Sequence, residues 1–175
     1  MKTQNQTMLS ENTLTSQPTD IIAGFPVRPG FFELNGATPL SNGVNFTAHT
    51  RHGTSCELLL FHSGEEEPFA VLPFPNACRI GDVYSMIVMG LDIEDLEYGY
   101  RIDGPYEPEK GHIFDKTKVL LDPYAKAVAG QREWGQQKIG SYHARVVRDS
   151  FDWEDMPQST RKISDLIIYE LHVRG

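Results

Sequence analysis

The chain has little of what several classes of protein require. It contains only two cysteines, Cys56 and Cys78, among 175 residues. Two isolated cysteines are too few for a disulfide framework or a zinc site, so we expect reduced structural thiols. Lys and Arg number 16 against 24 Asp and Glu, for a net charge of −8. Nucleic-acid binding needs clustered basic residues, so this charge argues against it.

Long apolar runs are also missing. No stretch is long enough to span a bilayer, and the N-terminus lacks the apolar middle of a secretory signal. We therefore expect no membrane partner and a cytoplasmic location. Residues 1–22 are dominated by Ser, Thr, Gln and Asn. Such a segment cannot bury enough surface to offset the entropy of ordering, so it is predicted to be a disordered polar tail.

From residue 24 the composition becomes that of an ordinary globular domain, with short segments of β character. These segments are 44–48, 56–60, 69–71, 84–89 and 98–102. In the third of them the apolar positions are Phe69 and Val71. Gly-containing turn signals separate the segments, and no helical pattern lies among them. The spacing predicts an antiparallel β-sandwich over residues 24–107, with a mainly-β fold class.

Residues 108–162 are predicted to form a helical or irregular connector. Asp115 is an N-cap candidate before the apolar run KTKVLL, Pro123 restarts the chain and Gly130 ends the helical pattern. The polar stretch 131–162 carries four aromatic residues, which suit a segment laid across a surface. They are Trp134, Tyr142, Phe151 and Trp153.

Residues 163–175 include the run DLIIYELHVRG. Leu166–Val173 is rich in β-branched and aromatic residues and predicts a strand buried on both faces. Glu170, His172 and Arg174 alternate on one face of that strand. They would form either an active-site lining or a buried layer of paired charges, and we favour the paired layer.

Several other polar residues are candidates for a site. His49 and His52 could bind a metal, but no third ligand is near in the sequence, so we expect turn histidines and no metal or cofactor. Glycosidic chemistry needs two carboxylates at a set separation, which neighbours such as Glu94 and Asp95 do not supply. Asp103 and Asp122 precede Gly-Pro and Pro, and turn roles explain both. We assign no catalytic residue and no specific substrate-binding residue.

Three stretches together resemble a known family. YGYRIDGPYEPEKG (98–111), KVLLDPYAKAVAG (118–130) and the terminal DLIIYELHVRG are similar to the N-terminal part of isoamylase-type glycogen debranching enzymes, in glycoside hydrolase family 13 of the α-amylase superfamily. The resemblance covers residues from about 24 to the end. One departure is Phe114-Asp115-Lys116, where relatives carry Asn-Pro after the Phe.

The resemblance implies a family 48 carbohydrate-binding module of immunoglobulin-like type at residues 24–107. It also implies that residues 163–175 contain the first strand of a truncated (β/α)₈ catalytic barrel, against which the module packs. Enzymes of the family cleave with retention, using an aspartate nucleophile, a glutamate acid/base and a second aspartate on later strands. None of those positions lies in this chain, so the fragment is expected to be non-catalytic. The implied partners are α-glucan, such as glycogen or branched dextrin, and the protein's own barrel.

Alternative interpretations stay open at this point. The chain could be a stand-alone glucan-binding or scaffold module, the N-terminal part of a branching enzyme, or an immunoglobulin-like interaction domain. A self-sufficient module should not carry an unpartnered buried strand, so the pattern favours the N-terminal part of a debranching enzyme.

Overall fold

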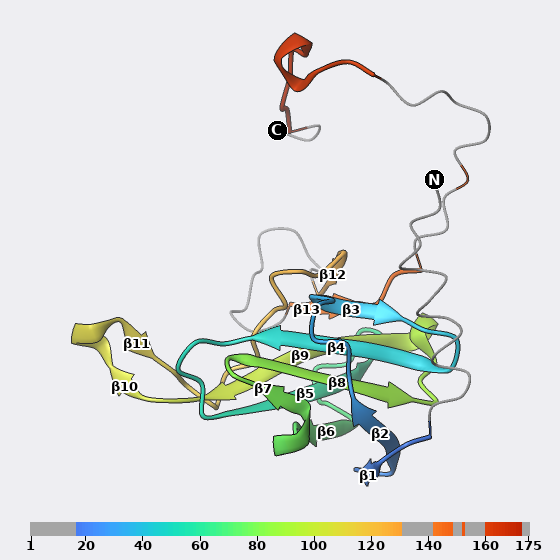
Figure 1. Ribbon diagram of the computed structural model, residues 1–175, viewed down its shortest axis with the longest axis vertical. Coiled ribbons are helices and arrows are strands. Elements are labelled where there is room, and N and C mark those ends of the chain that lie inside the picture. The colour runs from blue at the N-terminus through green and yellow to red at the C-terminus, as the bar shows by residue number, and fades with distance from the viewer. Residues whose placement is uncertain (1–16, 131–141, 149–151, 153–159, 173–175) are drawn as a thin grey trace.

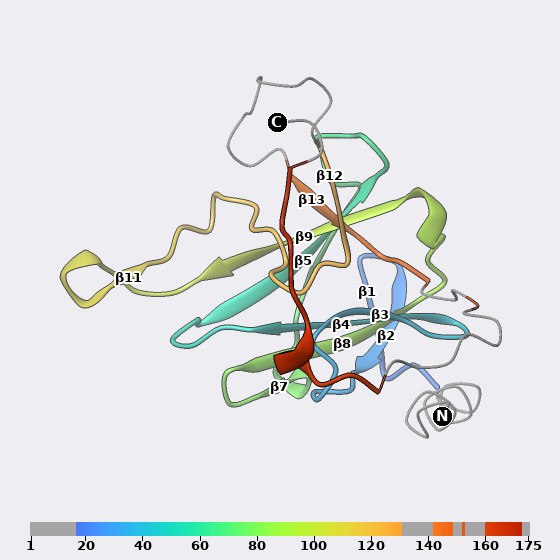
Figure 2. The same cartoon turned by 90° about the horizontal axis from the view of Figure 1, so that it is seen from above.

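The computed structural model describes residues 17–130, 142–148, 152 and 160–172. Two antiparallel sheets pack face to face (Figures 1 and 2). The first sheet has the strand order β1-β2-β8-β4-β3, with β7 paired to β8. Its strands are β1 (Asp20–Ile22), β2 (Phe25–Pro29), β8 (Val83–Met89), β4 (Gly43–His49), β3 (Gly36–Pro39) and β7 (Arg79–Ile80).

The second sheet has the order β12-β13-β9-β5-β6. Its strands are β12 (Ala127–Ala129), β13 (His143–Arg145), β9 (Leu96–Asp103), β5 (Ser55–His62) and β6 (Ala70–Pro73). A separate hairpin joins β10 (Tyr106–Glu107) to β11 (His112–Ile113). The described residues contain no α-helix, only the short 3₁₀ turns η1 (Asn76–Cys78), η2 (Ile93–Asp95), η3 (Pro108–Lys110) and η4 (Ile163–Asp165). None of the described residues forms a helix that could cross a membrane. The predicted mainly-β sandwich is confirmed.

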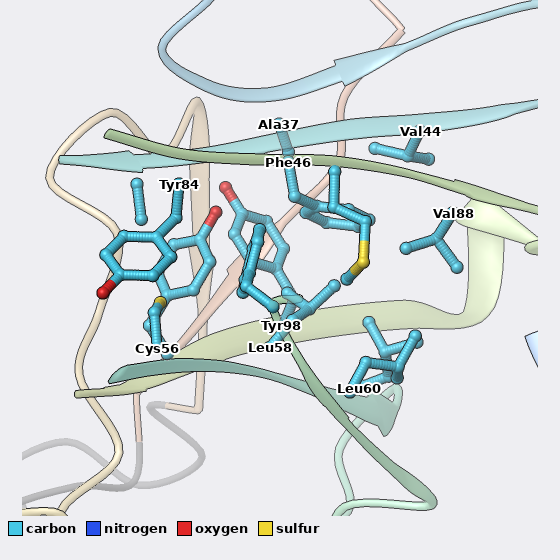
Figure 3. Packing of buried hydrophobic residues seen from close by; sticks show 14 of the residues in the cluster. Ala37, Val44, Phe46, Cys56, Leu58, Leu60, Tyr84, Val88 and Tyr98 are labelled. Carbon is cyan, nitrogen blue, oxygen red and sulfur yellow. The ribbon is translucent and has the colours of Figure 1, made fainter. Parts of the chain in front are cut away.

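The core lies between the two sheets and follows the alternation seen in the sequence (Figure 3). In β4 the side chains of Val44, Phe46 and Ala48 point inward, and in β5 the inward positions include Leu58 and Leu60. The rings of Phe46 and Tyr98 meet edge to face across the sandwich, with centroids 5.1 Å apart. The side-chain period of two therefore places one apolar face of each strand in a single core.

Both cysteines belong to this core. Burial raises the pKa of the Cys56 thiol to about 12 and that of Cys78 to about 11. At neutral pH both side chains therefore stay protonated and pack as small apolar groups.

The expected register of one segment is wrong. Phe69 precedes β6 and is 42% exposed, whereas Ala70 and Leu72 supply the core contacts. The reason is pairing: Ala70 lies opposite Leu60 and Leu72 opposite Leu58, both of which point inward. Because side chains alternate, a shift of one residue turns the opposite set toward the core.

The polar tail expected over residues 1–22 also overlaps a strand. β1 pairs with β2 through the two-residue turn Ala23-Gly24, in which both residues have positive φ angles of 49° and 86°. Turns of this kind match the twist of a β-hairpin, but alanine seldom adopts them, which hides the signal in the sequence. Residues 1–16 lie outside the described residues.

The helical turn expected after Asp115 is wrong. The Asp115 carboxylate accepts hydrogen bonds from the Thr117 N–H and hydroxyl, which closes a turn and not a helix. Leu120 then forms an antiparallel bridge with Tyr100, and β12 and β13 extend the second sheet beyond residue 107. Backbone pairing with β9 thus outweighs the weak helical preference of a short segment.

Asp122 anchors this connector to both sheets. Its Oδ2 accepts a 2.7 Å hydrogen bond from the Tyr98 hydroxyl, and its Oδ1 accepts one of 2.8 Å from the Tyr124 N–H. A Cβ added at Gly36 on β3 would lie 3.0 Å from the Tyr124 side chain, so glycine permits this close approach. We call Tyr98, Asp122 and Tyr124 the Asp122 clamp. Burial, reinforced by the Asp122 charge, raises the pKa of Tyr98 and keeps its hydroxyl a donor.

The terminal segment differs from the buried strand that was expected. Residues 166–172 form no strand in the structure, and the Ile167 side chain is 99% exposed. Glu170 and His172 are exposed as well, while Val173 and Arg174 lie outside the described residues. The Leu166 N–H donates to the Ile163 carbonyl, but no strand among the described residues pairs with residues 166–172, and their apolar side chains are exposed.

Candidate functional site

The polar residues singled out from the sequence do not converge on one place. Asp103 is the last residue of β9, and its carboxylate accepts a hydrogen bond from the Gly104 N–H. Asp122 has the expected local contact and, in addition, the buried bond to Tyr98. His49 is exposed at the end of β4, and His52 packs against the ring of His112, with centroids 4.5 Å apart. Among the described residues no group of three or more His, Cys, Asp or Glu side chains could hold a metal ion.

A group of rings gathers instead at one end of the sandwich. His62 ends β5, Phe69 follows the next loop, and Phe25 begins β2 of the other sheet. The His62 and Phe69 ring centroids lie 4.4 Å apart with a 30° tilt, and Phe25 lies 6.2 Å from Phe69. The Phe69 N–H donates to the Leu60 carbonyl, which fixes its backbone beside β5. We call Phe25, His62 and Phe69 the aromatic platform.

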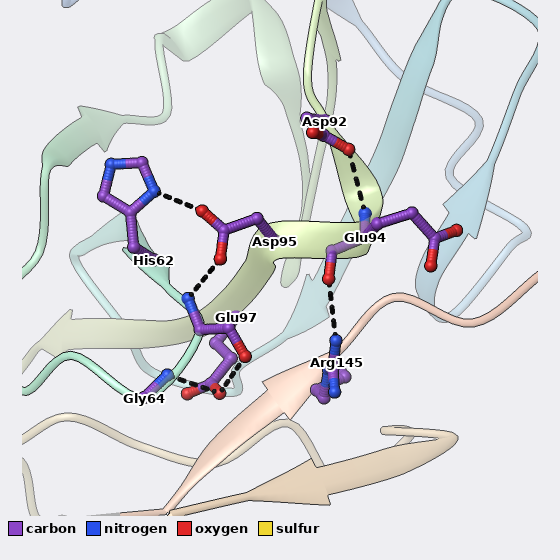
Figure 4. A network of polar contacts seen from close by, with 8 residues as sticks. His62, Gly64, Asp92, Glu94, Asp95, Glu97 and Arg145 are labelled. Atoms are coloured by element: carbon purple, nitrogen blue, oxygen red, sulfur yellow. Dashed lines mark hydrogen bonds and ion pairs between the residues drawn. The ribbon is translucent and has the colours of Figure 1, made fainter.

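Asp95 holds the His62 ring in place (Figure 4). Its Oδ2 lies 2.8 Å from His62 Nδ1, and its Oδ1 accepts a 3.0 Å bond from the Ser63 N–H. The hydrogen bond from His62, together with that from Ser63, holds the pKa of Asp95 below its ordinary value. The carboxylate is therefore ionised at neutral pH and orients one ring of the platform.

A second carboxylate, that of Glu97, contacts the same turn. Glu97 is 2% exposed, and its Oε1 accepts hydrogen bonds from the Gly64 N–H at 3.0 Å and the Ser63 hydroxyl at 3.3 Å. Its Oε2 lies 3.1 Å from Nδ1 of His143, which is buried on β13 and stacks on Phe61. Two carboxylates two residues apart thus hold the turn that carries His62.

This arrangement suits the binding of a neutral, hydroxyl-rich ligand. Exposed ring faces can pack against the C–H faces of a sugar, and the imidazole and carboxylate can hydrogen-bond to hydroxyls. Asp95 is kept ionised and Glu97 is enclosed by its own partners. The site therefore has the features of a binding surface and not of an acid and nucleophile flanking one bond.

Comparison with known proteins identifies a family to which the chain is similar. The family described as carbohydrate-binding module 48, the isoamylase N-terminal domain, matches residues 35–125. The chain belongs to this family. The matched range in this carbohydrate-binding module includes His62, Phe69 and Asp95 as well as Asp122 of the clamp.

Curated relatives extend the likeness over most of the module's chain. The chloroplastic isoamylase SU1 of Zea mays is 34% identical, over 89% of this chain and 20% of the relative. The glycogen debranching enzyme of Salmonella typhi is 35% identical, over 81% of this chain and 23% of the relative. The chain thus spans about a fifth of the length of these relatives. Among solved structures, pullulanase type I from Bacillus subtilis str. 168 has a TM-score of 0.48 and 20% identity, over 71% of this chain and 14% of that one.

Sequence reasoning did not find the aromatic platform of this carbohydrate-binding module. Phe69 was placed in a strand, and the contact between His62 and Asp95 joins residues 33 apart. One signal was available, since three glutamates followed by Pro68 mark a loop that ends next to Phe69. Trp134 and Trp153 of the connector lie outside the described residues.

Proposed function

We propose that this chain is the N-terminal, non-catalytic part of a glycogen debranching enzyme. The whole protein would hydrolyse α-1,6 branch points in glycogen or a related α-glucan with retention, and would work in the cytoplasm. The observation that carries this proposal is the 34–35% identity to isoamylase and glycogen debranching enzymes over 81–89% of the chain. The order of the three motifs, from DGPY through LLDPYA to YELHVRG, supports it.

The exposed terminal segment has a role in this proposal. Leu166–Val173 would be the first strand of the catalytic barrel, and later strands would cover it. Its composition supports this, because an apolar run rich in β-branched residues is costly to leave in water. The module would also pack against that barrel.

A direct experiment tests the debranching activity. The protein encoded by the whole reading frame is expected to release linear glucan from glycogen or limit dextrin, with the α-anomer as first product by NMR. The 175-residue chain is expected to release none, because the general acid and the nucleophile are both absent. A full-length protein that creates branches without hydrolysing α-1,6 bonds would contradict the debranching assignment and leave the family unchanged.

The proposed role of the module is to contact α-glucan at the aromatic platform. Phe69→Ala is expected to weaken binding of maltoheptaose about tenfold, because it removes the exposed ring face and its apolar area. Titration followed by NMR or calorimetry measures this change. Ile80→Ala is a matched control, since Ile80 is also an exposed apolar residue but lies on β7. Equal affinities for the two variants would exclude the platform as the contact surface.

A further inference from the structure

The turn that carries the aromatic platform is also linked to the strand on the far side of β9. Two consecutive backbone N–H groups of this turn donate to carboxylates, Ser63 to Asp95 and Gly64 to Glu97 (Figure 4). Asp95 and Glu97 are two residues apart, at the junction of η2 and β9. The position of the turn is therefore set by the segment that begins β9.

Glu97 connects the turn to β13 with its other oxygen. Oε1 receives the Gly64 N–H and Oε2 faces His143 Nδ1 at 3.1 Å. The His143 ring is stacked on Phe61 with a centroid distance of 3.8 Å and an interplanar angle of 17°. Both Glu97 and His143 are almost fully buried, so neither can exchange its partner for water without moving.

These side chains add to the backbone pairing of β13. Among the described residues, its ladder with β9 consists of two residue pairs, Ala144 with Tyr98 and Arg145 with Glu97. The Arg145 guanidinium adds a 2.9 Å hydrogen bond to the Glu94 carbonyl, within the same short segment that includes Asp95. A short ladder opens locally at low free-energy cost, so the side-chain contacts, together with burial of Ala144 in the core, add to the firmness with which β13 is docked.

We propose that Glu97 is a positioning residue that couples the aromatic platform to β13. A glucan bound at the platform restricts the motion of the Ser63-Gly64 turn. Because Glu97 contacts both this turn and His143, the restriction extends to His143, and β13 separates from β9 less often. By thermodynamic reciprocity, release of β13 weakens glucan binding by the same factor. This inference rests on the proposed sugar contact at the platform.

Hydrogen exchange of the 175-residue chain, measured by NMR with and without saturating maltoheptaose, tests the coupling. In the unmodified chain the sugar is expected to slow exchange of the β13 N–H groups about fivefold or more. Glu97→Ala is expected to speed exchange at Gly64 and in β13, to abolish the effect of the sugar on β13 and to weaken binding. Glu97→Gln should restore most of the coupling, because its amide can accept from Gly64 and donate to His143. Glu57→Ala, on the neighbouring strand β5, is the matched control and should leave the coupling intact.

Two results overturn the coupling. One is unchanged β13 exchange in a chain whose Phe69 resonances show that maltoheptaose is bound. The other comes from His143→Ala, which is expected to speed Gly64 exchange and shift the His62 imidazole resonances even without sugar; no change there contradicts the coupling. If the sugar causes no shift at Phe69 or His62, the proposed contact surface fails, and His143→Ala still decides whether the turn and β13 are linked. Far-UV circular dichroism confirms that each variant is folded.

Discussion

Removing residues 163–175 is expected to convert a self-associating chain into one that elutes as a monomer. The segment exposes six large apolar side chains, those of Ile163, Leu166, Ile167, Ile168, Tyr169 and Leu171. Of its described residues, those after the 3₁₀ turn η4 belong to no strand and have no strand partner among the described residues, so their backbone is a template for pairing with another copy. Size-exclusion chromatography with light scattering measures the monomer fraction of the full and shortened chains.

The same truncation should leave the sandwich intact. None of the described residues removed, 163–172, belongs to the buried core, so we expect the free energy of unfolding to change by less than about 0.5 kcal/mol. Ile167→Lys combined with Tyr169→Lys is a control of unchanged length and should also favour the monomer. Loss of a cooperative unfolding transition after truncation would show that the segment has a partner in the sandwich, which contradicts the prediction.

The strands of the sandwich could be predicted because their side chains alternate. Val44, Phe46 and Ala48 all point into the core, as do Cys56 and Leu58, and each set repeats with the period of two. Tyr98 continues the same pattern in β9. A strand with one face on a core leaves this mark in the sequence, whatever the neighbouring strands are.

The structure departs from the sequence pattern where tertiary contacts determine the local conformation or burial. The apolar run after Asp115 has helical spacing, but pairing between Leu120 and Tyr100 draws it into the second sheet. Asn45 and Thr47 are polar, yet both are buried, because the chain at Phe31 crosses that face of β4 and hydrogen-bonds to them. Local propensity and alternation contain no information on which loop will cover which face.

The candidate site could not be predicted for a related reason. His62 and Asp95 meet because β5 and β9 pair in a register that places His62 opposite Leu96. Glu97 and His143 are 46 residues apart and are joined by the docking of β13. The sequence gives the residue types of such contacts but not the long-range pairing that brings them together.

The second prediction with a large expected effect concerns the contribution of the Asp122 clamp to stability. Asp122→Ala is expected to lower the free energy of unfolding by about 2–4 kcal/mol, because it leaves the buried Tyr98 hydroxyl and the Tyr124 N–H without their acceptor. Tyr98→Phe should cost about 1.5–3 kcal/mol, since it removes a buried hydrogen bond to a carboxylate. Urea denaturation followed by circular dichroism gives these values, with the slope of the transition as a check that the unfolded state is unchanged.

Tyr100 provides the matched control for that series. It is a neighbour of Tyr98 on β9, it is 2% exposed, and its hydroxyl has no hydrogen-bond partner among the described residues. Burial, reinforced by the nearby Asp122 charge, raises the pKa of this hydroxyl well above its ordinary value, so it stays neutral. Tyr100→Phe removes only an unsatisfied polar atom, and its effect should lie within about 0.5 kcal/mol of zero or be stabilising. If Tyr100→Phe costs as much as Tyr98→Phe, the loss comes from packing at this end of the core, and the hydrogen bond to Asp122 is not what fastens the connector to the sandwich.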